Sequence, residues 1–191
     1  MPTTKVTDAT SEPITLAEAK LWTRVDVADD DTLFTGFCIP AARQDAETRL
    51  GRTLITTTWQ QSLDAFPASG CIELLYPLLQ SVDHVKYYDA AGVQQTWNSA
   101  NYLLDTTREP GRLALAPNIS WPTTQQRINA VEIQYKAGWT AAANVPAAIR
   151  QWIALRAATL YEHREMIIAG ASVAEVPFVN GLLDGYKVWG L

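Results

Sequence analysis

The chain has 191 residues, of which 48% are hydrophobic and 18% are charged, and its formal net charge is −5. This balance predicts a folded protein with a buried core, because disordered chains are poor in hydrophobic residues and rich in charge. It also argues against specific nucleic-acid binding, since no run of Lys or Arg supplies the cations that neutralise phosphates. The composition does not exclude a neutral or acidic surface along which DNA passes without being bound.

Targeting, membrane and cysteine signals are all weak. Residues 1–13 are polar and lack the apolar segment of a signal peptide, so we expect a flexible lead-in. No apolar run approaches the ~20 residues of a membrane span, and we expect no membrane association. Cys38 and Cys71 stand in no metal-binding or redox motif, which favours two free thiols.

Two helices are expected near the N-terminus. Thr15 and Glu18 have the spacing of a capping box, which predicts a short helix over 16–24. A second helix is expected from Asp29 to Leu50, with Gly51 as its C-terminal cap. Pro40 should kink or break this second helix, because proline removes one amide donor and crowds the preceding turn.

The segment 53–140 has the pattern of strands. It is rich in Thr, Ile, Val, Leu and Trp with partial alternation, and glycine-containing turns near 90–92 and 110–111 predict two hairpins. We expect an antiparallel β unit of six or seven strands.

Helix returns after Pro146 and should run over 147–166, followed by an apolar tail. The predicted fold class is therefore α+β. A small helical bundle, formed by 14–52 and 146–191, would contain two N-terminal helices and one long C-terminal helix, with the β unit of 53–140 inserted.

No motif for catalysis, cofactor binding or metal binding stands out. There is no glycine-rich phosphate loop, nucleophile elbow or paired-histidine metal motif, and the three aspartates at 29–31 lack the remaining ligands of a calcium loop. The two histidines, His84 and His163, are expected to be structural or surface residues. We expect a protein that is not an enzyme, with no cofactor.

The long C-terminal helix has an apolar stripe with arginines in or beside it. These are Arg150, Arg156 and Arg164. Their stems could cover the stripe while the guanidinium groups reach water, or this face could meet another subunit, where arginine is favoured.

The C-terminal tail is unusually apolar for a chain end. Its large side chains either fold back on the chain's own core or dock on a partner. If the tail is helical, Phe178, Leu182 and Tyr186 align at four-residue spacing, with Trp189 beyond them.

Several short segments, taken in order and with their spacing, resemble the head–tail connector, or adaptor, proteins of tailed bacteriophages, in the longer variant with a β insertion. The resemblance covers nearly everything from about 14 to 189. The segments are ITLAEAK at 14–20, DDD at 29–31, LGRTL at 50–54, PLLQSV at 77–82, VKYYD at 85–89, PGRL at 110–113, VEIQYKAG at 131–138, VPAAIRQ at 145–151 and LYEHRE at 160–165.

The resemblance implies a ring, expected to be dodecameric, beneath the portal protein in the neck of the virion. It implies that the ring joins the capsid to the stopper or tail, that the genome passes through its centre without specific binding, and that assembly occurs in the host cytoplasm. On this basis we expect Arg150, Arg156 and Arg164 at the subunit interface, and Phe178, Leu182, Tyr186 and Trp189 on the portal. Other neck or tail-completion proteins of the stopper type, and a small enzyme with an unrecognised site, are the alternatives.

Overall fold

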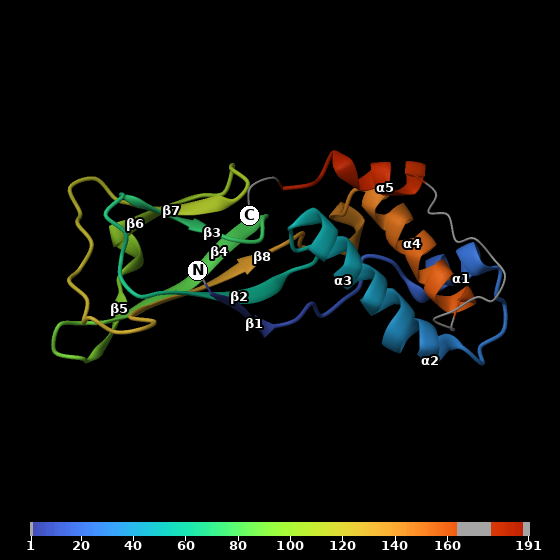
Figure 1. The fold of residues 1–191 in the computed structure, drawn as a ribbon, viewed down its shortest axis with the longest axis horizontal. Helices are drawn as coiled ribbons and strands as arrows, with labels where there is room; N and C mark the ends of the chain where they lie inside the picture. Colours follow the sequence, from blue (N-terminus) through green and yellow to red (C-terminus); the bar gives the residue numbers. More distant parts are fainter. Residues whose placement is uncertain (1, 164–176, 189–191) are drawn as a thin grey trace. The chain divides into compact units, whose positions relative to one another are not determined.

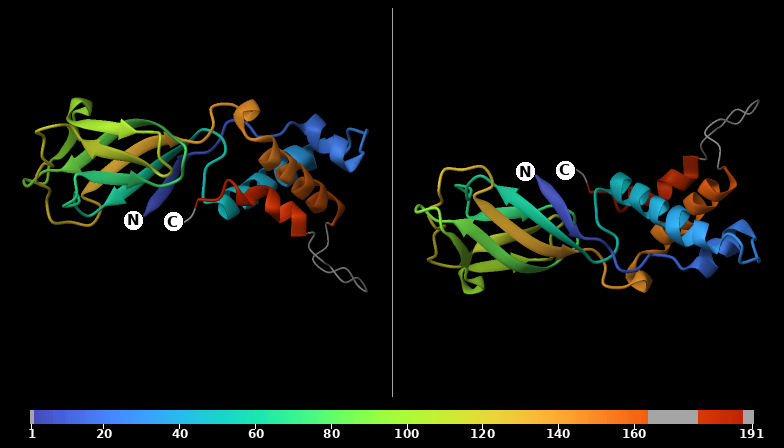
Figure 2. Two further views of the ribbon diagram at one scale, coloured as in Figure 1. Left: turned by 90° about the horizontal axis from the view of Figure 1, so that it is seen from above. Right: turned by 90° about the horizontal axis from the view of Figure 1, so that it is seen from below.

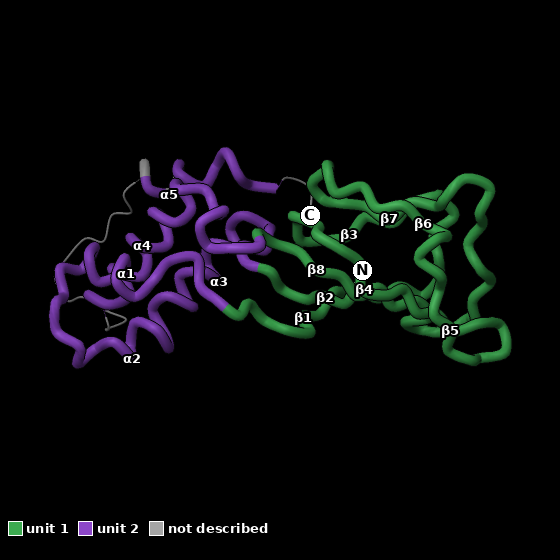
Figure 3. The backbone as a smooth tube through the Cα atoms, turned by 180° about the vertical axis from the view of Figure 1, so that it is seen from behind, with its two compact units in different colours: residues 1–10, 56–139, 191 green, residues 11–55, 140–190 purple. Residues whose placement is uncertain are grey.

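The computed structural model describes residues 2–163 and 177–188, and it is an α+β protein with antiparallel sheets (Figures 1 and 2). The chain divides into two compact units (Figure 3). The β unit comprises residues 1–10, 56–139 and 191, and the helical unit comprises residues 11–55 and 140–190. No helix among the described residues has the length and apolar character needed to cross a bilayer.

The β unit contains two antiparallel sheets. One has the strand order β1-β2-β8-β4-β5 and the other the order β3-β7-β6. The strands are β1 (Thr3–Thr7), β2 (Thr57–Leu63), β3 (Cys71–Leu74), β4 (Leu79–Tyr88), β5 (Gln94–Trp97), β6 (Tyr102–Asp105), β7 (Gly111–Leu115) and β8 (Val131–Ala137). A short 3-10 helix, η2 (Ser99–Asn101), connects β5 to β6.

Strand β1 corrects the expectation of a flexible lead-in over 1–13. It pairs antiparallel with β2, with Thr3 opposite Gln61 and Lys5 opposite Trp59. The segment is mostly polar and is exposed at four of its five positions, as an edge strand can be, so it has no hydrophobic pattern of its own. The β unit thus contains residues that precede the helical segment 11–55 in the sequence and residues that follow it.

The two sheets share one apolar core. Alternate residues of β8, among them Ile133 and Tyr135, are fully buried together with Val85 from β4 and Leu113 from β7. The alternation of buried and half-buried positions along β8 follows the period of two that a sheet with one covered face requires. The sheet part of the molecule is larger, and the bundle less dominant, than the sequence suggested.

Among its described residues the helical unit contains five α-helices, one of them only three residues long, and a π-helical turn joins this short helix to the next one. Its elements are α1 (Leu16–Thr23), α2 (Asp31–Leu33), the π-helix η1 (Phe34–Cys38), α3 (Ile39–Leu50), the 3-10 helix η3 (Ala142–Asn144), α4 (Ala147–Glu162) and α5 (Pro177–Asp184). Helix α4 packs against α1, η1, α3 and α5. Its buried side chains include Ile149, Trp152 and Ile153, which form the centre of this unit.

The helix does not break at Pro40, as the sequence allowed, but contains a π-helical turn just before it. The amide of Ile39 donates to the carbonyl of Phe34, five residues earlier. Pro40 has no amide hydrogen, so the ordinary helical bond to Gly36 cannot form, and the turn widens by one residue instead. Helix α3 then continues to Leu50 and ends at Gly51, whose φ of 65° is the left-handed cap predicted from the sequence.

Candidate interaction site

The described residues contain no group of three or more His, Cys, Asp and Glu side chains that could hold a metal ion. His84 lies half-buried in β4, and burial, followed by the charge of Lys86, lowers the pKa of its imidazole. His163 lies exposed just after α4, so the two histidines belong to different units. The helical unit carries inter-helix ion pairs and exposed apolar side chains.

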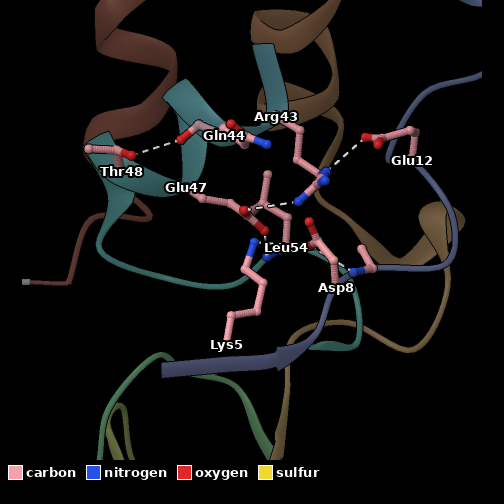
Figure 4. A network of polar contacts seen from close by, with 9 residues as sticks. Lys5, Asp8, Glu12, Arg43, Gln44, Glu47, Thr48 and Leu54 are labelled. Carbon is pink, nitrogen blue, oxygen red and sulfur yellow. Dashed lines mark hydrogen bonds and ion pairs between the residues drawn. The ribbon is translucent and has the colours of Figure 1, made fainter. Parts of the chain in front are cut away.

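A buried ion-pair network holds the start of the helical unit to α3 (Figure 4). Arg43, which is only 3% exposed, donates from Nε to Glu12 at 2.8 Å and from Nη1 to Glu47 at 3.1 Å. The second oxygen of Glu47 accepts a hydrogen bond from the amide of Leu54 at 2.9 Å. The Arg43 guanidinium thus links the segment before α1 to α3, and Glu47 extends this network to the chain that follows α3.

Arg150 of α4 pairs with Glu18 of α1 inside the same chain. Glu18 is also the carboxylate of the capping box: its Oε2 accepts the amide of Thr15 at 2.7 Å, while the amide of Glu18 donates to the Thr15 hydroxyl at 3.2 Å. These contacts lower the pKa of the Glu18 carboxyl, the Thr15 amide contributing most and Arg150 adding to it. The pair fixes α1 against α4.

Arg156 of α4 pairs with Asp45 of α3, Nε to Oδ2, at 2.9 Å. The other oxygen of Asp45 accepts from Arg49, also at 2.9 Å. Arg150 and Arg156 therefore both have carboxylate partners within their own subunit. The sequence could not reveal the second pair, because Asp45 and Arg156 lie 111 residues apart. Arg164 lies outside the described residues, and the role of the three in subunit contacts stays a prediction.

The tail is only partly described. Leu183 of α5 is buried, α5 packs against α3 and α4, and the amide of Val188 donates to the carbonyl of Leu50 at 2.9 Å. Leu182 and Tyr186 are half-buried, while the side chain of Phe178 and all of Trp189 lie outside the described residues. The tail thus has an anchor on its own subunit, and its docking on a partner stays a prediction.

The structure also reveals exposed apolar side chains that the sequence reading did not select. Among the described residues of the helical unit, the large ones fall within 21–37, and they are Leu21, Trp22, Val27 and Phe37. A signal was present in the sequence, since α1 carries apolar residues around its whole circumference, and such a helix has to be covered on more than one side.

A groove open to solvent runs along α1 and the turn that follows it, with a volume of about 590 Å³. Its lining is mainly apolar with charged residues among it, and consists of Leu16, Ala17, Lys20, Leu21, Arg24, Val25 and Asp26. Lys20 is already held by Asp31 at 2.7 Å and by the carbonyl of Val27 at 2.6 Å. The open and mainly apolar lining suits binding of an apolar side chain.

Comparison with known proteins finds no matching family model and no matching curated protein. Solved structures do match. A chain from the structure described as the virion of the native gene transfer agent (GTA) particle is 22% identical, with a TM-score of 0.81. A chain from the neck of the empty GTA particle, computed with C6 symmetry, is 25% identical with a TM-score of 0.80.

A chain from the neck of the native GTA particle, computed with C12 symmetry, is 22% identical with a TM-score of 0.73. Each of the three matches covers 100% of this chain and 97% of the matched chain. Over its whole length, the protein therefore shares the fold of chains found in the virion and neck of gene transfer agent particles.

Proposed function

We propose that this protein is a structural subunit of the neck of a phage-like particle, and that it acts there without catalysis. The observation that carries the proposal is the match to a GTA neck chain, which extends over 100% of this chain and 97% of the other at 25% identity. A match of this extent supports a structural role like that of the neck chain it resembles.

We further propose that the subunit is the adaptor of that neck. In this role it forms a ring of twelve copies, binds beneath the portal protein, and joins the capsid to a stopper or tail. The C6 and C12 symmetries of the matching neck structures support a ring, since both are compatible with twelve copies around an axis. The net charge of −5 supports a passage through which DNA moves without being held.

The tail supplies the proposed contact with portal. Leu183 anchors α5 on its own subunit, and the half-buried Leu182 and Tyr186 are left partly available. Aromatic and large apolar side chains of this kind dominate interface energies. We assign portal binding to Phe178, Leu182, Tyr186 and Trp189.

The test is a pull-down of the purified protein on assembled portal rings. The double variant Leu182→Ala, Tyr186→Ala should bind portal at least about tenfold more weakly while its circular dichroism and melting temperature stay close to wild type. Leu183→Ala is the matched control, because it removes a buried side chain and should lower the melting temperature. Unchanged portal binding by the double variant would refute the tail assignment, and no binding by the wild type would refute the adaptor role.

A further inference from the structure

The helical unit has a second exposed surface, on the continuous helix formed by α2, η1 and α3. Four residues at helical spacing on it are exposed and none is charged: Phe37, Ala41, Gln44 and Thr48. Exposed helix faces are usually rich in charge, whereas the centres of interfaces are depleted of it. We call these four residues the Phe37 stripe.

Phe37 is the protruding member of this stripe. Its side chain is 70% exposed, and the two residues before it, Thr35 and Gly36, are exposed and small. A Cβ added to Gly36 would meet nothing within 4 Å, so the surface next to Gly36 is open. The π-helical turn that precedes Pro40 is what presents Phe37 at this point.

The groove along α1 has the complementary shape and chemistry. Ala17 is the small residue in its lining, and Leu16, Leu21 and Val25 supply apolar surface around it. Leu21 is 78% exposed, which is as unfavourable for an isolated subunit as the exposure of Phe37. No residue of the Phe37 stripe lines this groove, so the two surfaces are separate.

We propose that the Phe37 stripe of one copy packs into the α1 groove of the next copy, with the Phe37 ring over Ala17. A protrusion and a different groove on the same chain make a head-to-tail contact, and such contacts close into rings when the rotation between copies is regular. This inference rests on the proposed ring and names the surfaces that would form it. It places the contact on α1 and α3, because the described arginines of α4 already have partners inside the subunit.

Cysteine cross-linking tests the pairing directly. In a Cys71→Ser background, in which Cys38 is buried, two proteins carry either Phe37→Cys or Leu21→Cys. Under mild oxidation an equal mixture of the two should give a covalent dimer, and neither protein alone should do so. Dimer formation by Phe37→Cys alone, at the yield of the mixture, would overturn the head-to-tail arrangement.

A charge substitution gives the second test. Leu21→Asp should weaken self-association at least about tenfold by analytical ultracentrifugation. The matched control is Ile128→Asp in the β unit, because Ile128 is also 78% exposed, and it should leave self-association unchanged. Association that resists Leu21→Asp, both in solution and on portal rings, would overturn the proposal.

The neck assignment can be separated from this contact. If wild-type protein binds portal as a ring and the mixed cysteine proteins do not cross-link on it, the neck role stands and the proposed surfaces are wrong. If the cross-link forms and portal does not bind, the contact stands and the adaptor role is wrong.

Discussion

The β unit and the helical unit are stabilised by different interactions. The β unit has a continuous apolar core, and its polar groups inside that core are uncharged, as with Gln61. The helical unit places a charged side chain, Arg43, in an equally buried position and adds further ion pairs between helices. Strand pairing fixes the register of a sheet through the backbone, whereas helices that pack on one another have no such ladder, so specific side-chain pairs define how they meet.

The largest effect is expected for Arg43→Ala in the helical unit. The change leaves Glu12 and Glu47 without the guanidinium that both now contact, and breaking a buried pair costs roughly 3–5 kcal/mol. Urea unfolding should show a loss of about 4 kcal/mol in the free energy of unfolding. The control is Arg112→Ala in the β unit, where a half-exposed pair with Asp105 should cost about 1 kcal/mol or less. Equal losses for the two variants would contradict the contrast between the units.

Gln61→Leu tests the uncharged polar contact between the two sheets. Gln61 is fully buried, donates to the carbonyl of Glu73 at 2.9 Å, and accepts from the amide of Leu75 at 3.2 Å. Leucine would leave both backbone groups without this partner, so we expect a loss of about 2–3 kcal/mol in the same measurement. Gln60→Leu, one position earlier and half-buried, should change stability by less than about 0.5 kcal/mol. If the two glutamine variants behave alike, Gln61 does not join the sheets.

Gly111→Ala tests close packing at the start of β7. A Cβ at Gly111 would lie 2.6 Å from the Cβ of Leu79 in β4, so one of the two strands has to move. The expected loss is about 2 kcal/mol, as for other overpacked cores. The control is Gly70→Ala, where the nearest atom, Cδ1 of Leu115, is 3.9 Å away. A stability of Gly111→Ala equal to that of the control would show that β4 and β7 are not in close contact.

The smallest effect concerns Glu18 and pH. The folded state lowers the pKa of the Glu18 carboxyl below its ordinary 4.5, chiefly through the Thr15 amide. Its stabilising contribution is therefore complete above pH 4.5 and is lost as the pH falls below that value through the folded pKa. Glu18→Gln keeps the capping geometry but cannot titrate, and we expect the difference in unfolding free energy from wild type, about 1 kcal/mol or less, to vanish in acid. A difference that is constant from about pH 6 to about pH 3 would contradict this account.

Local signals in the sequence predicted local structure well. The capping box of Thr15 and Glu18 and the left-handed cap at Gly51 depend on residues within one or two turns, and the structure confirms them. At Pro40 the structure shows a π-helical turn just before the proline, and the helix continues through it. Pro146 is the N-terminal cap of α4, and the helix begins at Ala147, where the sequence predicted it to begin.

Contacts between distant segments could not be predicted in this way. Strand β1 depends on a partner more than fifty residues away, and the pairs of Arg150 and Arg156 join helices separated by more than a hundred residues. No local pattern determines which partners such segments find. The exposure of Phe37 could not be predicted for the same reason, because exposure is a property of the packed unit, whereas the apolar residues all around α1 did give a local signal for Leu21.

The central claim, a place in the neck of a phage-like particle, is tested most directly by locating the chain in assembled particles. A peptide tag inserted at Arg108, in the exposed turn between β6 and β7, avoids both the helical unit and the proposed contact surfaces. Gold labelling of the tag in electron micrographs should place it at the junction between head and tail. Label spread along the tail, over the capsid, or absent from purified particles would contradict the claim.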